Sequence, residues 1–101
     1  MTFGQQIAQA RKDLGMSQKD LAAQIVKDDG QPISPQYLND IEHDRRNPPG
    51  PEMIGQFAKV LKLPMEVLYF LDGKLTEDLK KVSVDPDKIV DAYKAFRRAL
   101  K

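Results

Sequence analysis

The sequence predicts an all-α protein, and two observations support this. Apolar residues recur every three or four positions in successive segments, which is the period of an amphipathic helix. Helix-start signals precede several of these segments, with Ser or Asp at the cap position and Pro at the first helical position. The chain of 101 residues is long enough for one domain. We therefore expect about five packed helices and an additional C-terminal helix.

The first helix is expected from about Thr2 to Leu14. Thr2 is a plausible N-cap, and Gly15 suits the position that follows a helix end. Arg11 lies on this helix. The apolar side chains that share one helical face, and should point to the core, are Phe3, Ile7, Ala10 and Leu14.

Two further helices are expected between Ser17 and Asn47. Ser17 caps the first, and Asp20 follows three residues later, close to the capping-box pattern. Ser34 caps the second, whose first residue is a proline. A polar connector punctuated by Gly and Pro, Val26 to Pro32, should form a loop between them. The apolar residues at helical spacing are Leu21, Ala22, Ile25, Leu38 and Ile41.

The outer face of the helix after Ser34 is mostly polar, and amide side chains are prominent on it. A Gln or Asn amide can bond N6 and N7 of adenine together, so this face is suited to reading base edges. Its residues are Gln36, Tyr37, Asn39, Asp40 and His43.

This stretch resembles the Cro/repressor-like, or Xre-type, helix-turn-helix regulators of bacteria and phages. The resemblance runs from about Phe3 to Leu71 and departs from the family in two places. The connector is longer than the usual tight turn, and Asp44 replaces the usual Gly, although Asp tolerates the left-handed conformation better than most residues. The matching residues are Ser17-Gln18, Asp20-Leu21-Ala22, Ser34, Tyr37, Ile41-Glu42 and Arg45-Arg46-Asn47-Pro48.

The resemblance implies a five-helix lambda-repressor-like domain that regulates transcription. We expect a repressor that binds double-stranded DNA at a palindromic operator as a homodimer. Gln18 would bind phosphate, Ser34 phosphate or a base edge, and Tyr37 the backbone or a thymine methyl group. Gln36, Asn39 and Asp40 would read bases, and the two arginines would clamp phosphates with their guanidinium forks. The expected DNA-binding residues are Gln18, Ser34, Gln36, Tyr37, Asn39, Asp40, His43, Arg45, Arg46 and Asn47.

The resemblance also implies a structural ion pair between Arg11 and Glu42, which ends the reading helix. The alternative is that Arg11 is a solvated surface charge. Because buried ion pairs are weak evidence for net stability, the expected role of the pair is architectural.

Three more helical segments are expected beyond Pro51: about Pro51 to Leu61, Pro64 to Asp72-Gly73, and Pro86 to Leu100. A turn or two of helix could also form between Thr76 and Lys81. The last segment is too short for a stable isolated coiled coil, so it must pack on its own domain or on a second subunit. We expect a DNA-binding domain over 1–73 and a possible dimerisation element over 74–101. The stripe of the last helix is Ile89, Tyr93, Phe96 and Leu100.

Composition excludes several function classes. The chain has no Cys and one His, so disulfides, thiolate metal sites and multi-histidine metal sites are excluded. No Gly-rich phosphate loop appears, and we expect neither an enzyme nor a cofactor. No apolar run reaches the length of a membrane span and no signal peptide is evident, which favours a cytoplasmic protein.

The net charge is only +1, which does not by itself indicate nucleic acid. The near-neutral charge leaves a second interpretation open: an adaptor or antitoxin module that uses the same fold to bind a protein partner.

Overall fold

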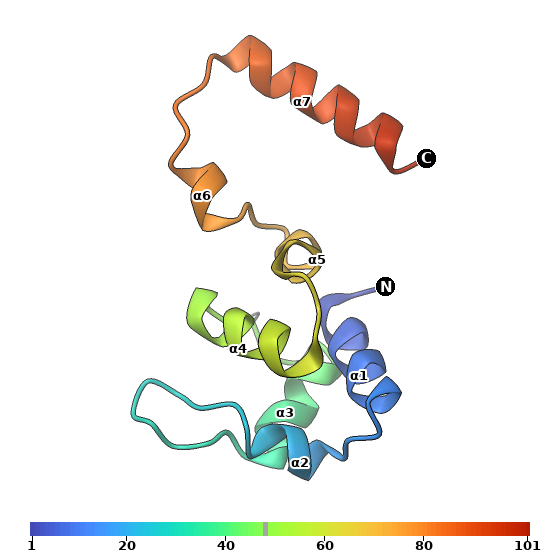
Figure 1. Cartoon of the computed structure of the whole chain (residues 1–101), viewed down its shortest axis with the longest axis vertical. Coiled ribbons are helices and arrows are strands. Elements are labelled where there is room, and N and C mark those ends of the chain that lie inside the picture. Colours follow the sequence, from blue (N-terminus) through green and yellow to red (C-terminus); the bar gives the residue numbers. More distant parts are fainter. Residues whose placement is uncertain (48) are drawn as a thin grey trace.

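The protein is built from helices joined by connections of unequal length. The computed structural model describes residues 1–47 and 49–101; Pro48, one of the residues that carry the resemblance, lies outside them. Within the described residues there are seven helices and one isolated β-bridge, which confirms the predicted all-α class. The helices are α1 Phe3–Asp13, α2 Gln18–Ala22, α3 Pro35–Glu42, α4 Pro51–Leu61, α5 Met65–Leu71, α6 Glu77–Lys80 and α7 Pro86–Ala99 (Figure 1).

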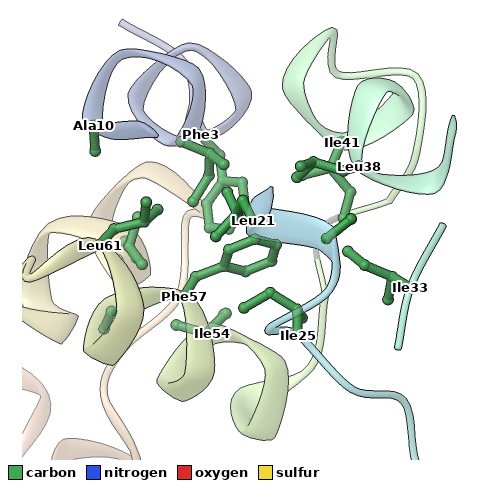
Figure 2. Packing of buried hydrophobic residues seen from close by; sticks show 14 of the residues in the cluster. Phe3, Ala10, Leu21, Ile25, Ile33, Leu38, Ile41, Ile54, Phe57 and Leu61 are labelled. Carbon is green, nitrogen blue, oxygen red and sulfur yellow. The ribbon is translucent and has the colours of Figure 1, made fainter. Parts of the chain in front are cut away.

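Within the described residues, one hydrophobic core is formed by side chains of the five helices α1 to α5 and of the connection between α2 and α3. Figure 2 shows the ring of Phe57 beside Leu21, with Ile54 and Ile25 close to it. Phe57 and Leu21 are completely buried, and each such side chain contributes roughly 1.5–3 kcal/mol by leaving water. The core hydrophobic residues are Phe3, Ile7, Ala10, Leu21, Ala22, Ile25, Ile33, Leu38, Ile41, Ile54, Phe57, Ala58, Leu61, Leu68 and Tyr69.

The start of α1 is attached to the end of α3. Thr2 caps α1 in a capping box with Gln5. Asp44 has φ 57°, the left-handed conformation that Asp tolerates better than most residues, and its carboxylate reaches across to α1. Its Oδ1 accepts from the Gly4 N–H at 3.0 Å, and its Oδ2 accepts from the Thr2 hydroxyl at 2.6 Å. These bonds hold the end of α3 against the first turn of α1.

Two large apolar side chains at the ends of core helices are exposed, and one of them, Leu14, is expected in the core from its spacing. Leu14 is 42% exposed because it follows the last residue of α1, where the chain turns away through Gly15. Met65 is 46% exposed at the first position of α5, where Pro64 is the N-cap rather than the first helical residue.

The C-terminal elements lie away from this core. Figure 1 shows α6 and α7 extending beyond α5, and neither contributes a buried residue. The Phe96 ring of α7 meets the Phe70 ring of α5 edge-on, with 5.4 Å between centroids, but both side chains remain about half exposed. The apolar stripe of α7 is therefore open to solvent in the single chain.

Candidate nucleic-acid interface

Side-chain caps fix the starts of α2 and α3. The Ser17 hydroxyl accepts from the Asp20 N–H at 3.0 Å, and the Asp20 carboxylate accepts from the Ser17 N–H at 3.2 Å. The backbone and side-chain hydrogen bonds from Ser17 lower the pKa of Asp20 below its ordinary value. At α3, the Ser34 hydroxyl accepts from the Tyr37 N–H at 3.0 Å, and Pro35 begins the helix. Both predicted helix starts are confirmed.

The connector between α2 and α3 is an ordered excursion, and we call residues Val26–Pro32 the wing. An antiparallel bridge joins its two ends, and Gly30 turns the tip with φ 82°. The Gln56 amide of α4 holds its base: Oε1 accepts from the Val26 N–H at 2.7 Å, and Nε2 donates to the Val26 carbonyl at 2.9 Å. The wing projects from the α2–α3 pair in Figure 1. Nothing local in the sequence identifies Gln56 as its support.

The outer face of α3 carries a polar network. The Gln36 amide donates to Asp40 Oδ1 at 3.0 Å, and Arg45 Nε donates to the same oxygen at 3.2 Å. Gln36 is exposed and Asp40 is half-buried. Asp40 therefore holds an expected base reader and an expected phosphate clamp together.

Three other expected site residues follow the last residue of α3: His43, Arg46 and Asn47. The Arg46 guanidinium lies over the Tyr37 ring, 3.9 Å from its centroid, in a cation–π contact. His43 caps the end of α3 through Nδ1, which is 2.9 Å from the Asn39 carbonyl. Asn47 is exposed.

Beneath this face lies the ion pair between Arg11 and Glu42. Arg11 Nε donates to Glu42 Oε2 at 2.7 Å and Nη2 to Oε1 at 3.0 Å, the bidentate geometry of a strong pair. Arg11 Nη1 also donates to the Met16 carbonyl at 2.8 Å. The two side chains are 10% and 3% exposed, so Arg11 is not a solvated charge. The pair ties α1 and the following turn to α3.

Gln18 connects this pair to the outer face. Its Nε2 donates to Asn39 Oδ1 at 3.0 Å and to Glu42 Oε1 at 3.1 Å. These contacts span 21 and 24 residues of sequence, so helical spacing could not predict them. They join Gln18 and Asn39, two expected site residues, to the ion pair.

Comparison with known proteins identifies the arrangement. A helix-turn-helix family model matches residues 7–68, more than half of the chain. The chain belongs to this helix-turn-helix family, in its Xre/Cro-like group. A chain from the SinR protein/SinI protein complex is similar in structure, with a TM-score of 0.54 and 27% identity, covering 98% of this chain and 91% of that one. Comparison with curated protein sequences gave no match.

In this helix-turn-helix protein, α2 and α3 are the two helices of the motif. The matched range includes both, together with the wing and all of α4, and ends within α5. Membership supports a DNA-binding transcriptional regulator. The α6 and α7 segment lies beyond the match.

Two further findings concern metal ions and membranes. Over residues 1–47 and 49–101, no group of three or more His, Asp or Glu side chains is placed to hold a metal ion. None of the helices in the same ranges combines the length and apolar character needed to cross a bilayer.

Proposed function

We propose that the protein is a repressor that binds a palindromic operator as a homodimer, with α3 in the major groove. The observation that carries this proposal is the exposed polar face of α3, flanked by Arg45 and Arg46. Helix-turn-helix dimers present two reading helices about 34 Å apart, so each protomer would read one half-site. The repressor assignment rests on the resemblance to the Cro/repressor-like family.

Within this proposal, Gln36 and Asn39 read base edges, with Asp40 a further candidate reader. Their half-exposed or exposed positions on α3 support this role. Arg45 and Arg46 bind phosphates and orient the domain without reading sequence. The other proposed DNA-binding residues are Ser34, Tyr37, His43, Asn47 and Gln18, the last through the backbone N–H groups at the start of α2.

Selection of sites from a random duplex library, followed by titration, tests the proposal. Replacing Gln36 or Asn39 by Ala should weaken binding to the selected site by roughly 1–3 kcal/mol and relax preference at particular positions. Gln9→Ala, which removes an exposed amide of α1, is the matched control and should change neither quantity. Unchanged affinity and preference in both α3 variants would exclude these residues as readers.

We also propose that residues 1–73 form the DNA-binding domain and that 74–101 form the dimerisation element. The positions of the buried hydrophobic residues support this division, since they run from Phe3 to Tyr69. The exposed stripe of α7 supports dimerisation, because large apolar side chains gain free energy when a partner covers them.

A second candidate function is binding of a different protein, as an adaptor or antitoxin would. The exposed apolar side chains of α7 favour it, and the similar solved structure is by its title a complex of two proteins. A salt titration on random duplex separates the two functions. A DNA-binding protein should lose affinity steeply as salt rises, because phosphate contacts release counterions, whereas an adaptor should show almost no dependence.

A further inference from the structure

The buried ion pair reaches the outer face through a chain of hydrogen bonds with a fixed direction. An ionised carboxylate has acceptors and no donor, so whatever bonds Glu42 must present a hydrogen to it. Gln18 lies 3.1 Å from Glu42 Oε1 and therefore turns its NH₂ group, not its oxygen, inward. The chemistry of Glu42 decides the orientation of the Gln18 amide.

The second hydrogen of the same NH₂ group decides the orientation of Asn39. Gln18 Nε2 lies 3.0 Å from the Asn39 side chain, and because this nitrogen only donates, Asn39 must offer its oxygen. The Asn39 NH₂ group is then directed away from Gln18. No hydrogen bond within residues 1–47 and 49–101 uses it.

We propose that Gln18 is a positioning residue that transmits the acceptor-only character of Glu42 to Asn39, so that Asn39 presents donors to the DNA. Asn39 would then select base atoms that accept, which are purine N7, guanine O6 and thymine O4, and reject the cytosine N4 donor. This inference rests on the proposed function and specifies what α3 reads. It also differs from a phosphate contact by the Gln18 side chain, whose two donor hydrogens are already used.

The test uses the full chain and the site selected by the wild-type protein. Asn39→Ala first identifies the base that Asn39 contacts, and cytosine is then placed there. The wild type should bind the cytosine site about tenfold more weakly. Gln18→Met removes both donor hydrogens and keeps a side chain of similar size. Its preference for the selected site over the cytosine site should therefore fall to that of Asn39→Ala. The double variant Gln18→Met/Asn39→Ala should show no further loss of this preference.

Two other variants complete the experiment. Gln24→Met, just beyond the end of α2, is the matched control and should keep the wild-type discrimination. Asn39→Asp keeps an acceptor for Gln18 but presents only oxygen outward, so its preferred base should change to cytosine. An Asn39→Asp protein that still rejects cytosine would overturn the proposal.

Two results with Gln18→Met would also overturn it. Undiminished discrimination would show that Gln18 does not orient Asn39. Equal weakening on all sequences, with the salt slope lower by about one, would assign Gln18 to a phosphate instead.

A measurement without DNA separates this inference from the proposed function. If the wild type selects no site, the proposed function fails, whereas side-chain amide exchange by NMR still tests the chain of bonds. The Gln18 amide hydrogens should exchange several-fold more slowly than those of exposed Gln24, and Gln18→Met should shift the Asn39 amide resonances. Equal exchange rates and unshifted resonances would overturn the inference.

Discussion

Gly4 shows how closely α1 approaches the end of the reading helix. A Cβ atom built on Gly4 would meet the backbone carbonyls of Ile41 and Glu42 and the Asp44 carboxylate. Backbone atoms cannot rotate away as a flexible side chain can. The glycine therefore permits the contact that holds α3 in place.

Gly4→Ala should destabilise the protein by about 1–3 kcal/mol or more, because the added methyl group overpacks a rigid contact. Gly55→Ala is the matched control: it lies inside α4 with no atom near its Cβ position, and should stabilise by roughly 0.5–1 kcal/mol. Urea unfolding measures both. Equal effects of the two substitutions would show that the close approach does not matter.

Arg46, whose guanidinium lies over the Tyr37 ring, is the subject of a second prediction at the residue scale. Arg46→Ala should weaken binding to all duplex sequences similarly and lower the slope of log affinity against log salt by about one, because one phosphate contact is lost. Titrations at several salt concentrations measure this slope. Lys59→Ala, at an exposed position of α4 outside both the α3 face and α7, serves as the control and should leave the slope unchanged. A loss limited to one base position would instead make Arg46 a base reader.

At the scale of elements, the wing depends on a helix far from it in sequence. Gln56 of α4 bonds both backbone groups of Val26, although 30 residues separate them. A polar connector of this length would otherwise lose little by fluctuating in water. The side-chain clamp explains why an expected loop has a defined shape beside α3.

Gln56→Ala should release the base of the wing at a cost of roughly 1–3 kcal/mol, the net value of two hydrogen bonds. Hydrogen exchange of the Val26 amide should become faster while the core amides of α1 stay protected. Lys59→Ala, at an exposed position of the same helix, should have no such effect. If Val26 protection survives Gln56→Ala, the clamp is not what orders the wing.

At the scale of the whole molecule, the open stripe of α7 leads to a prediction on assembly. Ile89 and Leu100 of this stripe are 44% and 62% exposed in the single chain. Replacing Ile89 with Glu should shift the protein toward monomer and weaken operator binding, because a charge would be buried at the proposed interface. Sedimentation with a parallel DNA titration measures both quantities.

Ala95→Glu adds the same charge to α7 off the stripe and is the control, which should remain dimeric. A protein that stays dimeric with Ile89→Glu would place the dimer interface elsewhere. A monomeric wild type would remove the dimer from the proposed function while leaving half-site reading by α3 to be tested separately.

The sequence by itself determined the all-α class, most helix starts and most of the core. Caps such as Ser17 and Ser34 act within three residues, and the apolar spacing of a helix is equally local, so both can be read from neighbouring positions. The resemblance supplied the Arg11–Glu42 pair, which the structure contains.

Only the tertiary structure decided which polar groups of the interface meet. The bonds of Gln18 to Asn39, Gln56 to Val26 and Asp44 to Thr2 join residues 21 to 42 positions apart. Such contacts depend on how whole helices pack, because the facing partner of a polar side chain is set by the relative placement of two elements and not by local spacing. The apolar stripe of α7 follows from local spacing and could be predicted from the sequence. Its exposure in the single chain depends on which elements pack against it, so only the tertiary structure decides it.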